Sequence, residues 1–254
     1  MSKPKWKIRT LSLLLLAVIL ADGALTGAAF AVAQHAAYPE RVGRAYAGNQ
    51  LEIPAVRQVA AFVPEQHDSS VPQVALTFDD GPHQTCTPKL LDGLKQRGIK
   101  ATFFLMGENI AGKEELVQRM QEEGHLIGNH SYRHIQMTKE GAEQACAEIE
   151  QTEQLIQSIT GKRPEYLRPP YGAWNEQLEC RVNLTTVLWN VDSLDWKFQN
   201  TRRIVRWVEK DVKDGDIILM HDIFPTSVEA ALQIVDDLQK RGYEFVTVEE
   251  LLVD

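Results

Sequence analysis

From Gln73 to its C-terminus, the chain alternates short apolar segments with longer helical ones. Such alternation is typical of α/β proteins, in which right-handed crossovers make neighbouring strands parallel. Seven units in about 180 residues leave two arrangements, an open doubly wound sheet or a closed barrel. The expected strands cover residues 73–78, 101–105, 125–128, 166–168, 185–191, 216–220 and 244–248.

The helices expected between these strands carry recognisable start signals. Thr at an N-cap accepts a hydrogen bond from a free backbone N–H, and Pro fits the first helical position. Thr87-Pro88, Thr138 and a capping box at 226–229 (Thr-Ser-Val-Glu) therefore mark three helix starts. Helices are predicted over residues 88–98, 113–123, 138–161 and 226–242, with another opening at Thr201 and a short one at the end.

Polar residues that can bind metals or transfer protons follow five of the seven strands. Parallel α/β folds place their chemistry at the C-terminal ends of the strands. Because both halves of the sequence contribute, a barrel that is closed or nearly closed is favoured over a linear sheet. The residues are Asp79 and Asp80, then His130 and His134, then Arg168 to Tyr171, then Asp192, Asp195 and Trp196, and finally His221 and Asp222.

Asp80, His130 and His134 form a donor set suited to a divalent metal. One carboxylate oxygen and two imidazole nitrogens suit Zn²⁺ with an open coordination position, and they tolerate Co²⁺, Mn²⁺ or Ni²⁺. The alternative is a turn aspartate followed by two helix-capping histidines. The Asp-Asp-Gly-Pro run at a strand end favours the metal.

The second carboxylate, Asp79, is then free to act as a base on a water molecule that the metal activates. His221, an imidazole, suits the general acid that protonates a leaving group. Arg168 is expected to hold Asp79 by a bidentate contact and to keep it ionised, and Asp195 to hold the other nitrogen of His221. Taken singly, each of these contacts could be a surface ion pair.

The N-terminus resembles an export signal. Basic residues precede an apolar run at 11–20, and small residues follow as far as Ala33. This pattern predicts a cleaved secretory signal peptide or an uncleaved membrane anchor at residues 1–33. Residues 34–71 lack sustained periodicity and indicate a stalk, so the catalytic domain is expected at 72–254. The protein is therefore predicted to be exported, and either secreted or held at the cell surface by its N-terminal segment.

Charge narrows the choice of partners. The whole chain carries a net charge of −8, and without residues 1–33, which hold four basic residues and one acidic residue, −11. This sign disfavours nucleic acids and anionic membrane surfaces, and it fits a neutral substrate better than a polyanion. Contact with a membrane is expected only through the N-terminal segment, and the protein is expected to be a monomer. Cys86, Cys146 and Cys180 lack metal-type spacing and allow at most one disulfide.

Five ordered motifs resemble those of the polysaccharide deacetylases, the NodB-homology group or carbohydrate esterase family 4. The resemblance covers about residues 72–254. It implies a distorted (β/α) barrel of about seven strands with a divalent metal, usually zinc. The motifs are Thr-Phe-Asp79-Asp80-Gly-Pro, His130-Ser-x-x-His134, Arg168-Pro-Pro-Tyr171-Gly, Asp192-x-x-Asp195-Trp196 and Leu219-x-His221-Asp222.

The resemblance also implies roles for these residues. Asp79 is similar to the family's base, Asp80, His130 and His134 to its metal ligands, and His221 to its acid. Arg168 resembles the residue that orients the base, and Asp195 the partner that tunes the acid. The Tyr171 N–H resembles an oxyanion donor, and Trp196 and Leu219 the apolar wall around the acetyl methyl group. The segment 173–183 is short for the family.

The expected reaction is hydrolysis of N-acetyl groups of an amino-sugar polysaccharide, with release of acetate. Peptidoglycan N-acetylglucosamine is the first choice of substrate, because an export signal and a short stalk suit an enzyme that works on its own cell wall. Chitin or its oligomers, and acetylated xylan, are the alternatives. In another class, the chain would be a glycan-binding module with an inactive deacetylase fold. The presence of both Asp79 and His221 argues against such a module.

Overall fold

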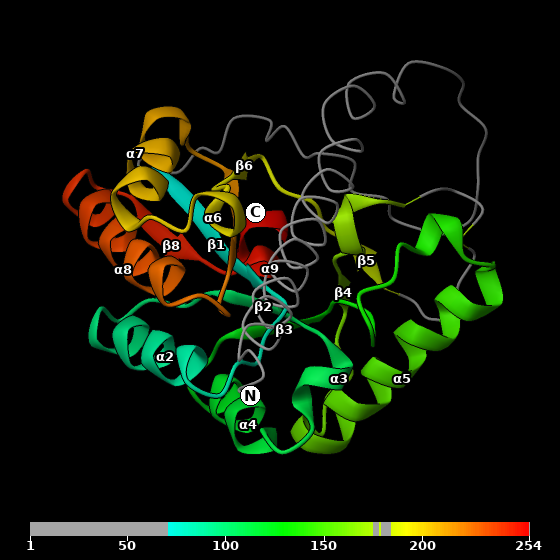
Figure 1. Cartoon of the computed structure of the whole chain (residues 1–254). Helices are drawn as coiled ribbons and strands as arrows, with labels where there is room; N and C mark the ends of the chain where they lie inside the picture. The colour runs from blue at the N-terminus through cyan, green and yellow to red at the C-terminus, as the bar shows by residue number, and fades with distance from the viewer. Residues whose placement is uncertain (1–70, 175–177, 179–183, 254) are drawn as a thin grey trace, which may run out of the picture. The chain divides into compact units, whose positions relative to one another are not determined.

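The computed structural model describes residues 71–174, 178 and 184–253, which are coloured in Figure 1. The predicted signal or anchor at 1–33 and the predicted stalk, apart from its last residue, lie outside the described residues. The described part contains a single parallel sheet. Its strands are β1 (Gln73–Asp79), β2 (Thr102–Leu105), β3 (Leu126–Asn129), β4 (Tyr166–Leu167), β5 (Thr185–Thr186), β6 (Val191–Asp192), β7 (Asp216–His221) and β8 (Glu244–Val246).

The sheet runs in the order β5-β4-β3-β2-β1-β7-β6, and β1 lies at its centre. The last three residues of β1 pair with β2, and its first three pair with β8 on the same side. On the other side, β7 pairs along almost the whole of β1. The predicted parallel α/β fold is therefore confirmed.

A short segment joins the two edges of this sheet. The strand predicted over 185–191 is divided, because β5 pairs with β4 at one edge and β6 pairs with β7 at the other. The Val187 N–H donates to the Leu167 carbonyl, and the Asn190 N–H donates to the Ile217 carbonyl. Three residues span at most about 10–11 Å, so the two edges must curl towards each other. The result is the nearly closed barrel that the sequence predicted.

Alternation along the strands decides which side chains enter the barrel. Successive strand residues point to opposite faces of a sheet. Phe78 belongs to the large core cluster between sheet and helices, whereas Ala75 belongs to the cluster inside the barrel. Asp79 therefore ends β1 on the inner face. The same period on β7 places His221 on the inner face with Ile217.

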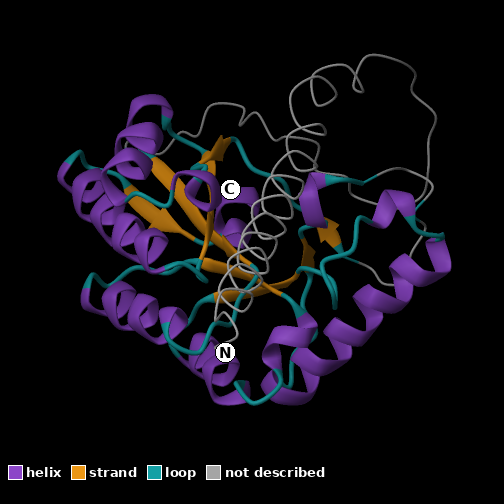
Figure 2. Ribbon diagram, in the orientation of Figure 1, coloured by secondary structure: helices purple, strands orange, loops and turns teal. Residues whose placement is uncertain are grey.

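Helices cover the outer face of the sheet (Figure 2). The short helix α9 (Val248–Val253) instead contributes Val248 and Leu251 to the interior cluster. No helix of the described residues is both long and apolar enough to cross a bilayer. The outer helices are α2 (Cys86–Gln96), α4 (Glu114–Glu122), α5 (Ala142–Thr160), α7 (Thr201–Asp211) and α8 (Pro225–Lys240). The other short helices are α3 (Gly107–Ile110) and α6 (Asp195–Phe198). Two 3-10 turns lie at Met137–Lys139 and Pro170–Gly172.

Three of the predicted helix starts are wrong, while the start at Thr201 is confirmed. Helix α2 begins one residue before Thr87, whose hydroxyl accepts from the His83 N–H and donates to Asp222 instead of capping the helix. Helix α5 begins at Ala142, after the 3-10 turn that contains Thr138. Helix α8 begins at Pro225, and its N-cap makes no side-chain hydrogen bond. A hydroxyl that is engaged by another part of the fold cannot also cap its own helix, which the local sequence does not reveal.

Candidate metal centre and active site

The predicted site residues meet at the C-terminal end of the barrel. Asp79 lies directly opposite His221 in the register of β1 and β7, although most of the domain separates them in sequence. Asp80 follows β1, His130 follows β3, and Arg168 follows β4. The tertiary structure therefore brings together residues that the sequence placed only at strand ends.

Asp80, His130 and His134 converge as a donor set. Asp80 Oδ1 lies 3.5 Å from His130 Nε2 and 3.6 Å from His134 Nε2. Ligands in tetrahedral coordination at about 2.0–2.1 Å from a zinc ion lie about 3.3–3.4 Å apart, so these separations suit such an ion. Asp80 Oδ1 is also buried and has no hydrogen-bond partner, as expected of an oxygen that is kept for a cation. The three residues therefore fit a divalent metal.

Hydrogen bonds orient the first of the two histidines. His130 Nδ1 lies 2.6 Å from the Arg168 carbonyl oxygen, so this nitrogen carries the proton and Nε2 is left as the ligand atom. Burial, followed by the neighbouring His134, lowers the pKa of His130 to about 3. The imidazole is therefore neutral, which is the form that binds a metal. The ring of Tyr171 packs edge-on against His134, with ring centres 4.6 Å apart.

Backbone strain is concentrated in this region. Non-glycine residues with positive φ are uncommon, and each costs of order 1–3 kcal/mol unless its surroundings hold it. Local hydrogen bonds hold two of them. Asn109 Nδ2 donates to the Asp80 carbonyl at 2.7 Å, and the His134 N–H donates to Ser131 Oγ at 3.0 Å. The positive-φ residues are Asp80, Ser131, His134, Tyr171, Leu194 and Gln199.

Arg168 lies fully buried inside the barrel and contacts Asp79. Its Nη1 donates to Asp79 Oδ1 at 2.8 Å and to Thr77 Oγ1 at 2.6 Å. Nε and Nη2 donate to the carbonyl groups of Val187 and Leu188, in the segment that closes the barrel. The expected bidentate contact is therefore wrong, because the guanidinium divides its donors between the carboxylate and the closing segment.

The environment of Asp79 makes it a stronger base than an ordinary aspartate. Burial raises the pKa of Asp79, and the opposing charges of Arg168 and then His221 only partly offset this effect. Arg168 was expected to keep Asp79 ionised. Its charge does lower the pKa of Asp79, but the effect of burial is larger. A raised pKa brings a carboxylate closer to the value that suits a base at neutral pH.

His221 is held on two sides by one carboxylate. Its Nδ1 lies 2.7 Å from Asp195 Oδ1, and its backbone N–H donates to Asp195 Oδ2 at 2.8 Å. Burial alone would lower the pKa of His221, but the charge and hydrogen bond of Asp195 outweigh burial and raise it to about 10. Conversely, burial would raise the pKa of Asp195, and His221 reverses this and lowers it. The pair keeps the imidazole protonated and leaves Nε2 for other partners.

The three residues predicted to contact substrate lie around these groups. Tyr171 has a left-handed backbone, and within the described part of the chain its N–H has no hydrogen-bond partner. Leu219 is buried on the inner face of β7, two residues before His221. Trp196 is half-buried, and its backbone N–H donates to Asp195 Oδ1. The segment 173–183, which is short for the family, lies mostly outside the described residues.

Two motif residues, Thr77 and Asp222, have supporting contacts that the sequence did not predict. Thr77 accepts from Arg168 and donates to the Ile218 carbonyl at 2.7 Å, and its inner-facing position in β1 could have indicated it. Asp222 is fully buried against Gly81, where an added Cβ would lie 2.5 Å from its Oδ1. Burial raises the pKa of Asp222 to about 7 despite the bond from Thr87. Its position at a strand end and in a motif marked Asp222, but the local sequence does not reveal its bond from Thr87.

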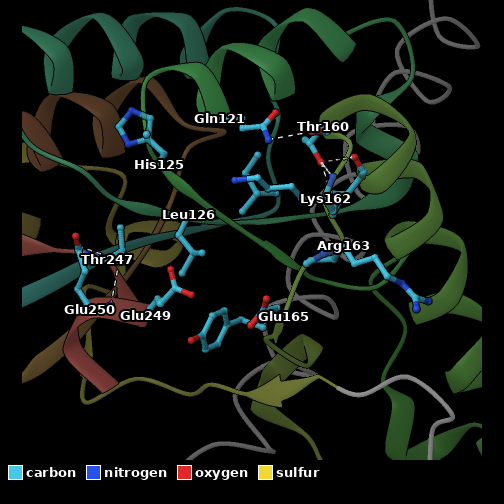
Figure 3. A pocket seen from close by; sticks show the side chains of 15 residues that line it. Gln121, His125, Leu126, Thr160, Lys162, Arg163, Glu165, Thr247, Glu249 and Glu250 are labelled. Atoms are coloured by element: carbon cyan, nitrogen blue, oxygen red, sulfur yellow. Dashed lines mark hydrogen bonds between the residues drawn. The ribbon is translucent and has the colours of Figure 1, made fainter. Parts of the chain in front are cut away.

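A cavity of about 360 Å³ lies away from this site, near the beginnings of β3 and β4 (Figure 3). It is lined by polar and charged side chains, among them Lys162, Glu165 and Thr247. None of the predicted site residues lines it. In (β/α) barrels this end of the strands serves stability, whereas the opposite end serves chemistry.

Replacing Arg168 with Met is expected to lower the free energy of unfolding by about 3–5 kcal/mol, because the buried Asp79 would lose its charged partner. The measurement is urea-induced unfolding. Lys210→Met is the control, since its ion pair with the exposed Asp211 is worth at most about 1 kcal/mol. A loss for Arg168→Met no larger than that of the control would show that the buried pair is not required for stability.

The fold and the site together define a (β/α)-barrel protein with a candidate metal donor set between a carboxylate and an imidazole. The sequence profile of the polysaccharide deacetylases matches residues 66–186. The chain is 41% identical over 179 residues to the peptidoglycan-N-acetylglucosamine deacetylase PgdA of Listeria monocytogenes, covering 70% of this chain and 38% of that protein. It is 33% identical to a chitooligosaccharide deacetylase of Bradyrhizobium, covering 72% of this chain and 92% of that protein.

A solved structure agrees with the sequence relatives. The peptidoglycan deacetylase PdaC of Bacillus subtilis superimposes with a TM-score of 0.70 at 40% identity, covering 72% of this chain and 91% of that one. The chain therefore belongs to the polysaccharide deacetylase family. It spans less than half the length of the Listeria relative.

Proposed function

We propose that the protein removes acetyl groups from N-acetylglucosamine in peptidoglycan, outside the cell or at its surface. The observation that carries this proposal is the register of β1 and β7, which sets Asp79 and His221 opposite each other beside the metal donor set. A base and an acid on either side of one reacting centre are what amide hydrolysis needs. The name of the Listeria relative supports the choice of substrate.

In this mechanism, Asp80, His130 and His134 hold a divalent metal, for which we propose Zn²⁺. When bound, it supplies a Lewis acid that polarises the acetamide carbonyl and makes water more acidic. Asp79 takes a proton from the attacking water, and Arg168 keeps the Asp79 carboxylate aimed at the site. The Tyr171 N–H donates to the oxygen that becomes negatively charged when water adds to the carbonyl carbon.

His221 completes the reaction. As the carbon–nitrogen bond breaks, Nε2 donates its proton to the departing nitrogen. The products are acetate and a free amine on the sugar. Trp196 and Leu219 form an apolar wall for the acetyl methyl group. The catalytic domain of this proposal is residues 72–254, acting as a monomer, with residues 1–33 as the export signal or anchor.

Two other functions compete with this one. Deacetylation of chitin oligomers is favoured by the relative from Bradyrhizobium, and acetylated xylan would need the same machinery. A glycan-binding module without turnover would have no use for both Asp79 and His221. Acetate release by the full-length protein, with added Zn²⁺, is measured on purified peptidoglycan, N-acetylglucosamine oligomers and acetylated xylan. Release from the oligomers or from xylan, but not from peptidoglycan, would replace the proposed substrate. No release from any of the three would refute the enzymatic function.

Asp195→Asn is expected to shift the alkaline limb of kcat/KM to lower pH. The raised pKa of His221 keeps the acid protonated up to about pH 10, and without the Asp195 charge this pKa falls. The stabilisation from the raised His221 pKa is likewise fully present below about pH 6.5 and lost as the pH rises through about 10. The measurement is a pH–rate profile, with the exposed Asp211→Asn as control. An unchanged profile would contradict the role of Asp195.

A further inference from the structure

Helix α7 presents a cationic and aromatic surface. Its buried side chains, including Ile204 and Val208, face the core, and its other side carries Arg202, Arg203, Arg206 and Trp207. We call these four residues the α7 face. Trp207 is 42% exposed and is the one large hydrophobic side chain that is exposed in the described part of the chain. The face therefore combines three guanidinium groups with one accessible indole.

The arginines of the α7 face are not engaged with carboxylates. In the described residues, none of the three forms an ion pair, although five other arginines do: Arg97, Arg119, Arg133, Arg163 and Arg168. Arg203 instead lies over the ring of Phe198 at 3.9 Å, and Arg206 Nε donates to the Arg202 carbonyl. Like charges at positions i and i+4 of a helix repel each other, as Arg202 and Arg206 do. The charges of Arg202 and Arg206 therefore do not stabilise the helix.

Direct contacts link the α7 face to residues beside the active site. Trp207 Nε1 donates to the Asp192 carbonyl at 3.0 Å, at the end of β6. The ring of Trp207 packs edge-on against Phe198, with centres 5.7 Å apart. Phe198 ends α6, the short helix that begins with Asp195, the partner of His221. A polymer in the site could thus continue onto this face.

We propose that the α7 face binds the acidic peptide substituents of the peptidoglycan strand whose acetyl group is in the active site. This proposal rests on the proposed function and specifies its substrate. Guanidinium groups bind carboxylates in a bidentate manner, and peptide stems carry free carboxylates. Neutral chitin oligomers offer no such groups. An anionic membrane is the less suitable partner, because Trp207 contacts Asp192 beside the site in which the glycan is proposed to lie.

The test compares full-length wild type with R202Q/R206Q on two substrates, glycan strands with intact peptide stems and N-acetylglucosamine oligomers. We expect KM for the stem-bearing strands to rise about fivefold at low salt. This is the size of effect expected when two exposed pairs between arginines and stem carboxylates are lost. KM for the oligomers should stay the same. High salt should remove the difference between the proteins, because it screens exposed charges.

The matched control is K162Q/K240Q, which removes two exposed lysine charges at the C-terminal ends of α5 and α8, away from the active-site end of the barrel. Its KM for both substrates should equal that of the wild type. An unchanged KM of R202Q/R206Q for stem-bearing strands, or an equal rise on both substrates, would overturn the proposal. So would R202Q/R206Q losing binding to phosphatidylglycerol vesicles while its KM for the strands stays unchanged.

Binding without turnover separates this proposal from the proposed function. If wild type releases no acetate from either substrate, the proposed function fails. Co-sedimentation with insoluble, stem-bearing peptidoglycan then tests whether the α7 face binds the peptide stems. Pelleting of wild type with R202Q/R206Q left in the supernatant supports the α7 face. Equal pelleting of the two proteins overturns it.

Discussion

An Asp79→Asn variant is expected to release acetate about 10²–10⁴-fold more slowly than the wild type, which is the range for loss of a general base. The amide of Asn can still accept from Arg168 Nη1, so the geometry of the barrel interior should survive. The amide of this Asn cannot take a proton from water, however. The measurement is kcat with a saturating amino-sugar polymer and added Zn²⁺.

The control for this experiment is Asp92→Asn, which alters an exposed aspartate in a surface ion pair. It should retain wild-type kcat. Thermal unfolding of Asp79→Asn should show a cooperative transition, which would separate loss of the base from loss of the fold. If folded Asp79→Asn kept a kcat within about threefold of the wild type, another group would have to be the base.

Removal of the metal is the second change with a large expected effect. Chelation should reduce acetate release to the uncatalysed background, because Lewis-acid activation supplies several kcal/mol of transition-state stabilisation. Added Zn²⁺ should restore it. His134→Ala removes one of three donors and should bind less than one-tenth of the metal that the wild type holds, as measured by elemental analysis of dialysed protein.

His83→Gln provides the comparison for His134→Ala. His83 lies outside the donor set and accepts backbone N–H groups at the beginning of α2. It should therefore bind as much metal as the wild type. Full activity in the metal-free protein, or full metal content in His134→Ala, would show that Asp80, His130 and His134 are not the metal site.

The location of the site could be read from the sequence, because it depends on local patterns. The period of two in β1 puts Asp79 on the inner face, and the motif spacing supplies His130 and His134. Helix starts were less predictable. Thr87 carries the signal of an N-cap, yet its hydroxyl bonds to Asp222 from the far end of the domain. Such contacts arise from residues that the local sequence does not contain.

The distribution of charge over the surface could not be read from the sequence. The net charge of −8 favours a neutral substrate, and it is a sum over the whole surface. Folding separates the arginines that pair with carboxylates from Arg202, Arg203 and Arg206, which form no ion pair with any residue that the structure describes. A local cationic face can therefore exist on an acidic protein. Only the positions of the partners in space reveal it.

The sequence by itself determined the class of fold, the end of the barrel at which the candidate site residues gather and the residue types of the candidate metal site. These follow from periodicity and spacing, which are properties of neighbouring residues. Only the tertiary structure decided that β7 lies beside β1, that Asp79 therefore opposes His221, and that residues 187–190 close the barrel. Strand order and closure depend on pairing and burial between distant segments, whose free energies no local stretch of sequence contains.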